Sequence, residues 1–488
     1  MPATLYWYDY ETFGSDPMRD RPAQFAGLRT DEELNPIGDP LVLYCRPAED
    51  FLPQPQACLI TGITPQLARA QGIHEAAFIS RILAEFSQPQ TCIAGYNNIR
   101  FDDEITRQCL YRNLFDPYAH EWQGGNSRWD LIDVVRLTYA LRPEGMVWPK
   151  REDGAPSFKL DQLVIANGIA HSCAHEALAD VRATIELARL LRARQPKLYA
   201  YCFSHRFKAH ARQLLDLTAM QPVLHVSEKY PAHRGCLAMV APVGVSPTNP
   251  NGVVVYDLSV DPEPFLSLAA EDLRALLFTP GERLPEGIER PPLKIVRINR
   301  CPILVPVAAL RPQDAERLNL NPARCLKHLK TLRRHRDRLC ALLPELFKPP
   351  KEAPTDPDLL LYRGGFFSAA DRARLEELKR LPPERLGKLP LAFEDPRLPE
   401  LVFRYRARNW PETLTLEERQ RWDEFRRQRL TQPEGGASIV WDQYWEELKK
   451  LNRSESDQHR IEILKMLAAY AREIFPAPSP CLGGKRLA

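Results

Sequence analysis

The sequence predicts a multidomain α/β protein, because its 488 residues divide into three stretches of different character. At about 100–200 residues per domain, this length suggests two to four domains. Residues 1–195 alternate β-rich and helical segments, residues 196–347 carry short β runs between turn residues, and residues 355–476 read as successive amphipathic helices. We therefore expect an α/β domain, a small barrel-like domain and an all-α C-terminal domain.

The expected elements of the first domain follow from hydrophobic periodicity. Aromatic and β-branched runs predict strands at 4–10, 40–45 and 91–96. Helical spacing of apolar residues covers 74–86, 102–113, 128–141, 159–167 and 175–194.

The later elements are shorter and separated by clear breaks. Short β runs occupy 222–227, 236–245, 252–258, 293–298 and 302–307, and helices are expected at 263–277 and 312–346. The Pro-rich residues 348–354 predict a linker. Beyond it, amphipathic helices are expected at 368–380, 414–430, 438–451 and 456–475, with a disordered tail at 477–488.

Composition excludes several classes of protein. No run approaches the roughly 18 apolar residues that a membrane span needs, and the N-terminus has no secretory pattern. The eleven cysteines are scattered and include no C-x-x-C pair, which excludes a zinc ribbon or thioredoxin motif and argues against disulfides. We expect a reduced, cytoplasmic protein that does not bind membranes.

The charge is distributed unevenly. Residues 1–195 are net acidic and residues 196–350 net basic, although the whole chain carries only +3. This suggests carboxylates gathered for a metal beside cations gathered for a polyanion. Ordinary solvated faces are the alternative explanation.

Two carboxylates end the first predicted strand. Because side chains alternate along a strand, Asp9 and Glu11 project from the face that carries Leu5 and Trp7. Neighbouring carboxylates on a buried face repel each other and are poorly solvated, and a divalent cation relieves both effects. Taken alone, the pair also fits a strand that ends in a polar turn.

Three further stretches strengthen the metal hypothesis. Asp102 is the first residue of a predicted helix after a strand and a polar turn, where an ordinary N-cap is the alternative. His175 and Asp180 open another predicted helix, where a polar helix-terminal histidine is the alternative. Thr61 lies in a turn of small residues, where a planar base would be able to approach the backbone.

Together, Asp9, Glu11, Asp102 and Asp180 offer hard oxygen ligands that suit Mg²⁺ or Mn²⁺ rather than zinc. Two such ions about 3.5–4 Å apart hold the attacking and leaving oxygens of a phosphoryl displacement. His175, with an ordinary pKa near ~6.5, suits the role of general base.

This order of residues resembles the DEDDh branch of the ribonuclease-H-like 3′→5′ exonucleases, with His175 as the final histidine. The similarity is closer to the bacterial exodeoxyribonuclease I family and extends over almost the whole chain. It includes DYETFG (9–14), GYNNIRFDDE (95–104), NSRWDLIDVVR (126–136), ANGIAHSCAHEALADV (166–181), INRCPIL (298–304) and GFFSAADR (365–372).

The resemblance implies both a fold and an activity. It implies a ribonuclease-H-like exonuclease domain, an SH3-like β-barrel domain and a helical C-terminal domain. The implied activity is processive, Mg²⁺-dependent degradation of single-stranded DNA from the 3′ end to 5′-mononucleotides, in repair or recombination. We expect a monomer in which the three domains together encircle the strand.

A nuclease acting on single strands needs a charged groove with aromatic platforms. The family uses basic or aromatic residues at several matching positions, and at position 159 lysine replaces the family's arginine. A packed aromatic pair is the alternative for Tyr118 and Trp122. The candidate DNA contacts are Glu11, Thr61, Arg107, Tyr118, Trp122, Arg136, Lys159, Arg206, Lys208 and Arg300.

Residues 324–338 form a second basic candidate. On one helix, Arg324, Lys327, Lys330 and Arg334 share a stripe that is able to line a phosphate track. On the same helix, Leu326, Leu329 and Leu332 are expected to face inward. A solvated basic helix is the alternative.

The resemblance also implies a partner, the acidic C-terminal tail of single-stranded-DNA-binding protein. Basic residues beside an apolar slot suit a peptide that ends in a carboxylate. Gln221 and Pro306 depart from the family's residues at the edge of this pocket, which suggests weaker binding. The matching pocket positions are Arg142, Tyr201, Arg311, Leu326 and Arg333.

Two alternatives remain at this point. A ribonuclease acting on RNA ends would resemble the first domain only, and discrimination would depend on contacts to the 2′-hydroxyl. A non-catalytic DNA-binding adaptor on the same fold would normally lack one of the metal ligands, and here each carboxylate is present.

Overall fold

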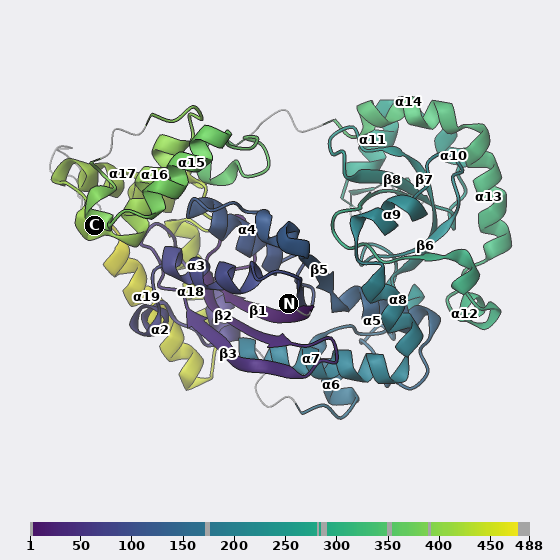
Figure 1. Ribbon diagram of the computed structural model, residues 1–488, viewed down its shortest axis with the longest axis horizontal. Helices are drawn as coiled ribbons and strands as arrows, with labels where there is room; N and C mark the ends of the chain where they lie inside the picture. The colour runs from purple at the N-terminus through teal and green to yellow at the C-terminus, as the bar shows by residue number, and fades with distance from the viewer. Residues whose placement is uncertain are drawn as a thin grey trace.

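The computed structural model describes residues 3–170, 176–280, 283–284, 290–348, 354–388 and 392–476. His175, most of the predicted linker 348–354 and the predicted tail 477–488 therefore lie outside the described residues. Figure 1 shows the second domain on the right, the first domain at the lower centre, and the C-terminal helices on the left.

A five-stranded mixed sheet in the order β3-β2-β1-β4-β5 forms the centre of the first domain. Strand β1 pairs antiparallel with β2 and parallel with β4, so it lies in the middle. Leu5 and Trp7 pack under α5 and α7, whereas Tyr6 and Tyr8 pack on the opposite face. The elements are β1 (Thr4–Thr12), β2 (Pro22–Thr30), β3 (Pro36–Tyr44), α1 (Pro55–Thr61), α2 (Pro65–Gln71), α3 (Glu75–Phe86), β4 (Thr91–Gly95), α4 (Asp102–Arg112), β5 (Ser127–Asp130), α5 (Leu131–Leu141), α6 (Leu160–Ala166), α7 (Ala177–Arg194) and α8 (Pro196–Ser204).

One element of this domain differs in type from the prediction. The helix expected from residue 128 begins at Leu131, because 127–130 form β5 and pair in parallel with β4. The Asp130 side chain then caps α5 by accepting the N–H of Ile132. Strand β2 was not predicted, because all of its residues are buried and the usual alternation is missing.

The second domain contains an antiparallel sheet in the order β10-β6-β7-β8-β9. The predicted β runs all appear as strands, and helices cover the sheet. The elements are α9 (Lys208–Leu214), β6 (Val223–Val226), β7 (Leu237–Val245), β8 (Gly252–Asp257), α10 (Glu263–Leu266), α11 (Ala270–Phe278), β9 (Leu293–Arg297), β10 (Leu304–Pro306), α12 (Pro312–Arg317), α13 (Pro322–Arg334) and α14 (Arg336–Leu346).

The basic stretch 324–338 divides between α13 and α14 at His335. Leu329 and Leu332 are buried as predicted, but Leu326 is 45% exposed, which corrects the expectation that it faces inward. The buried stripe of α13 instead follows i, i+3, i+4 and i+7 spacing from Cys325, so Leu326 lies off this face. Helix α13 lies on the outer side of the second domain (Figure 1).

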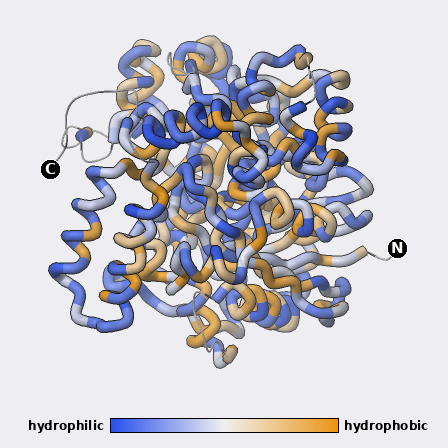
Figure 2. Tube along the Cα trace, turned by 90° about the vertical axis from the view of Figure 1, so that its left-hand side faces the viewer, coloured by the Kyte–Doolittle hydropathy of each residue, from blue (hydrophilic) through white to orange (hydrophobic). Residues whose placement is uncertain are grey.

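The C-terminal helices do not pack as a separate unit. Phe13 and Phe51 of the first domain share one hydrophobic core with Tyr444 and Leu467. Along these helices, which face the viewer in Figure 2, hydrophilic and hydrophobic residues alternate. The helix α16 was not predicted. The elements are α15 (Ala369–Lys379), α16 (Leu398–Asn409), α17 (Leu416–Thr431), α18 (Trp441–Ser454) and α19 (Gln458–Ile474).

Across the described ranges, no helix is both long and apolar enough to span a membrane. The nine cysteines in these ranges are free thiols, and seven of them are buried.

Candidate active site

The carboxylates predicted on β1 meet a third one from α7. Asp9 and Glu11 continue the face of Trp7, and Asp180 projects from the first turn of α7, which packs on that face. Asp9, Glu11 and Asp180 each offer an oxygen within 4.8 Å of the others. Three hard oxygen ligands at this spacing fit a divalent cation such as Mg²⁺ or Mn²⁺.

Asp102 approaches the same point from the other side of β1. A Cβ on Gly95 would come within 2.9 Å of the Tyr8 carbonyl oxygen, so the small residue lets the chain turn closely past β1. The Asp102 carboxylate accepts the N–H of Tyr10 at 3.3 Å. Its neighbour Asp103 is neutralised instead by an ion pair with Arg128.

The electrostatics of the cluster also favour a cation. Burial and the neighbouring charges of Asp102 and Asp180 raise the pKa of Asp9 well above its ordinary range. Burial, Asp9 and Asp180 likewise raise the pKa of Glu11 to about 9. Burial is also the main cause of the raised pKa of Asp102, with Asp103 next. A bound cation would compensate this repulsion.

The Glu11 shift gives a testable pH dependence. Its pKa is higher in the folded protein, at about 9, than its ordinary value of 4.5, so the folded state binds the extra proton between these values. In chelator-treated protein, stability should therefore fall as the pH rises from 5 to 9. Thermal unfolding at each pH, with Glu11→Gln as the comparison, should show a shallower fall for the variant. Equal slopes would contradict this assignment.

Two predicted site residues stand apart from this geometry. His175 lies outside the described residues, and Glu176 is the N-cap of α7. Thr61 ends α1 before Gly62, whose φ of 70° produces the predicted turn.

A large cavity of about 990 Å³ opens beside α4, where all three domains meet. Its wall includes residues 206–208, 248–251 and 297–301 of the second domain and residues of the segment 361–366 of the C-terminal domain. Six of the ten predicted DNA contacts line it: Arg107, Tyr118, Trp122, Arg206, Lys208 and Arg300.

A second cavity of about 380 Å³ shares Arg297, Arg300 and Cys301 with the first. It extends to Arg100 and Asp130, beside the turn that precedes Asp102. Arginine and lysine residues of the second domain line both cavities, together with carboxylates of the first domain. Neither cavity is lined by Asp9, Glu11, Asp102 or Asp180.

Arg136 and Lys159 line neither of these two cavities. Arg136 is buried, pairs with Asp133 at 2.7 Å and stacks over Phe158. Lys159 follows Phe158 in the chain and is exposed. Of these two residues, only Arg136 is therefore packed against Phe158.

The basic stripe of α13 is also absent from both cavity walls. The structure therefore gives no support to its predicted use as a phosphate track.

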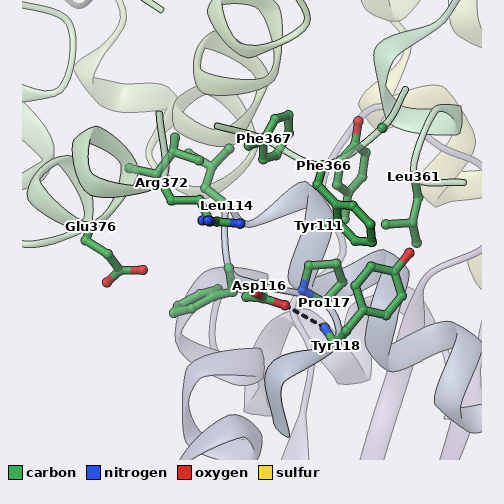
Figure 3. A pocket seen from close by; sticks show the side chains of 13 residues that line it. Tyr111, Leu114, Asp116, Pro117, Tyr118, Leu361, Phe366, Phe367, Arg372 and Glu376 are labelled. Carbon is green, nitrogen blue, oxygen red and sulfur yellow. Dashed lines mark hydrogen bonds between the residues drawn. The ribbon is translucent and has the colours of Figure 1, made fainter. Parts of the chain in front are cut away.

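The sequence interpretation missed aromatic residues contributed by the C-terminal domain. Tyr362 is 49% exposed and Phe366 83% exposed, and both line the large cavity. In the adjoining apolar pocket, Phe366 meets Tyr118 edge-on with ring centres 5.9 Å apart (Figure 3). The available signal was the run of aromatics beside Gly364 and Gly365, which has no helical or strand periodicity.

The residues predicted to form the peptide pocket lie in two separate places. Arg311 pairs with Asp314 at 2.6 Å, and Arg142 approaches the same carboxylate at 3.7 Å. The Tyr201 hydroxyl donates to the Leu304 carbonyl oxygen beside them. Arg333 and the exposed Leu326 lie on α13 instead. Gln221 and Pro306 are both exposed.

Comparisons with known proteins cover almost the whole chain. Family models described as Exonuclease, Exonuclease I SH3-like domain and Exonuclease I C-terminal domain match residues 6–188, 206–349 and 355–474. Exodeoxyribonuclease I of Escherichia coli K12 is 49% identical over 476 residues, which is 97% of this chain and 98% of that protein.

Solved structures agree with the family models. Exonuclease I from Methylocaldum szegediense has a TM-score of 0.93 at 58% identity, and the E. coli enzyme in complex with a dA16 oligonucleotide has 0.92 at 48%. Both matches cover 97% of this chain and 100% of the other. A third, SSB/Exonuclease I in complex with an inhibitor, has 0.88 at 47% with the same coverage. The predicted fold class is thereby confirmed.

Proposed function

Because the chain belongs to the exodeoxyribonuclease I family, we propose that it removes nucleotides from the 3′ end of single-stranded DNA at the Asp9–Glu11–Asp180 cluster. The observation that carries the proposal is this cluster of mutually repelling carboxylates, whose repulsion a bound divalent cation would relieve. The family membership makes the chain a phosphodiester hydrolase, and its relatives have been solved with oligonucleotides.

The residues present fit a two-metal site. Asp9, Glu11 and Asp180, with Asp102 beside them, would hold Mg²⁺ or Mn²⁺, which when bound neutralises the developing charge on the phosphate oxygens. We propose Mg²⁺ as the physiological ion. Glu11 additionally orients the terminal nucleotide, and His175 accepts the proton of the attacking water.

The large cavity is the proposed path of the strand. Bases stack on Tyr118, Trp122, Tyr362 and Phe366, because aromatic stacking tolerates every base. Arg206, Lys208 and Arg300 supply positive charge for phosphates, and Thr61 lies in the turn proposed for the terminal base. Arg136 and Lys159 are proposed as contacts nearer the cleaved end.

Single-stranded-DNA-binding protein is the proposed protein partner, since a relative of this chain has been solved together with it. Two groups of residues would receive its acidic tail. One is the apolar Leu326 with Arg333 on α13. The other consists of the two arginines beside Asp314, which are Arg142 and Arg311. We propose a cytoplasmic location, because the described cysteines are all free thiols.

Digestion of labelled oligomers tests this function. With Mg²⁺, a 5′-labelled single-stranded DNA should shorten progressively, whereas a 3′-labelled strand should release its label at once. Matched RNA and duplex DNA should be degraded more slowly. Faster degradation of RNA would favour a ribonuclease, and binding without shortening would favour a non-catalytic adaptor.

Removing the exposed ring of Phe366 should weaken binding of the strand. Stacking contributes about 1–3 kcal/mol per base, so Phe366→Ala should raise KM for single-stranded DNA by roughly 5- to 150-fold at similar kcat. Leu416→Ala is the matched control, because Leu416 is 76% exposed on α17 and lies outside the cavity wall. Equal KM values for both variants would show that Phe366 does not contact the strand.

A further inference from the structure

One carboxylate beside the large cavity receives hydrogen bonds from two other domains. Glu104 lies on α4 of the first domain, two residues after Asp102, and its side chain is 12% exposed. Its Oε1 accepts from Arg300 of the second domain, and its Oε2 accepts from the Tyr362 hydroxyl of the C-terminal domain. We call this group of three residues, one from each domain, the clasp: Glu104, Arg300 and Tyr362.

Within the first domain, Arg107 supports this arrangement. Its Nη1 donates to Glu104 Oε1 at 2.8 Å and to the Tyr362 hydroxyl at 3.2 Å. Its remaining nitrogens form a two-bond pair with Glu121 at 2.6 and 3.0 Å. Arg107 is thus fixed by its own domain, while it helps to orient the group that arrives from the C-terminal domain.

The clasp links the three domains at the wall of the large cavity. Arg107, Arg300 and Tyr362 all line the large cavity. Glu104 does not line it, but its carboxylate accepts a hydrogen bond from each of these three side chains. The second domain follows the first in the chain, but Tyr362 lies 258 residues beyond Glu104, so its bond closes a long loop around the cavity. Charge-assisted hydrogen bonds in a partly buried place are the stronger kind.

We propose that Glu104 is a positioning residue for processivity: it holds the three domains closed around the strand, and the Tyr362 hydroxyl is the closing bond on the C-terminal side. Here the proposal rests on the proposed strand path. Opening of this contact releases the strand sideways between cleavage steps. Glu104 therefore acts on how long the enzyme stays on DNA, more than on each hydrolysis.

Two nearly isosteric variants separate these effects. Glu104→Gln removes the charge that both partners use, and Tyr362→Phe removes the closing bond but retains the ring for stacking. Tyr444→Phe is the matched control, because the Tyr444 hydroxyl donates to the Leu467 carbonyl oxygen in a core away from the cavity. The measurement is the number of nucleotides removed per binding event from a 5′-labelled strand, with excess unlabelled DNA as a trap.

We expect the run length to fall by roughly 2- to 10-fold in each variant, because each weakens the hydrogen bond between Glu104 and Tyr362. The rate of the first cleavage should fall less. The double variant should lose less than the sum of the two single losses, because both changes weaken the same Glu104–Tyr362 contact. The proposed role of the clasp would be overturned by unchanged run lengths, by additive losses in the double variant, or by an equal fall in the rate of the first cleavage. A parent protein that leaves the strand intact would instead overturn the proposed function.

Discussion

Replacing Asp358 with alanine should destabilise the protein by about 3–5 kcal/mol, because it removes a buried carboxylate that several buried arginines share and leaves them with fewer counter-charges. Asp358 is 2% exposed and pairs with Arg408 at 2.5 Å and with Arg404 at 3.0 Å. Burial alone would raise the pKa of Asp358, but Arg408 and Arg404 hold it well below its usual range. Chemical denaturation should show this loss directly.

The same ion network joins two domains. Arg408 also contacts Asp50 of the first domain at 2.9 Å, and Asp50 is fully buried. Loss of Asp358 should therefore loosen the C-terminal helices from the first domain. Asp153→Ala is the control, because Asp153 forms an exposed pair with Arg151 and its loss should have no measurable effect. A similar unfolding free energy for Asp358→Ala and the parent would contradict this account.

Replacing Asp9 with asparagine should nearly abolish hydrolysis while leaving the protein more stable. We expect kcat to fall by about 10³-fold or more, because a ligand for the charge-neutralising ions is lost. In metal-free protein the melting temperature should rise, since Asp9 repels Asp102 and Asp180. Steady-state digestion and thermal unfolding of one preparation measure both effects.

Asp103→Asn provides the comparison for Asp9→Asn. Asp103 is also a buried carboxylate near the site, but it pairs with Arg128 and accepts from Tyr8. Its loss should lower stability, because Arg128 keeps fewer partners. If Asp9→Asn lowered stability and Asp103→Asn raised it, the assignment of Asp9 as a repelled carboxylate and of Asp103 as an ion-paired one would be wrong.

Periodicity predicted much of this fold because most elements obey it. Strand β1 alternates between two buried faces, so Asp9 and Glu11 could be placed together from the sequence. Strands β2 and β5 were missed or mistaken for helix because their residues are buried on both sides. Which domain covers a helix is likewise a tertiary property, as the exposed Leu326 illustrates.

The C-terminal domain also limits what a truncation can test. Truncation near residue 350 would remove the helices that are expected to help encircle the strand. Because Tyr444 and Leu467 share a core with Phe13 and Phe51, this truncation would expose part of the first domain. Tyr362→Phe addresses the same question without that loss.

Site residues could be predicted from the sequence where they belong to a short local motif. The carboxylates follow strand and helix ends, whereas Tyr362 and Phe366 reach the cavity from more than 200 residues away in the chain from Tyr118. Glu104 was read only as part of the motif around Asp102. Its role depends on Arg300 and Tyr362, which only the packed domains bring to it.

Metal add-back tests whether the carboxylate cluster holds the ion that cleavage requires. Chelator-treated protein and its Asp180→Asn variant are each incubated with a 5′-labelled single-stranded DNA, with and without Mg²⁺. We expect a ladder shortened from the 3′ end only for the parent with Mg²⁺, while both proteins bind the strand. Shortening without a divalent ion, or equal shortening by Asp180→Asn, would contradict this expectation.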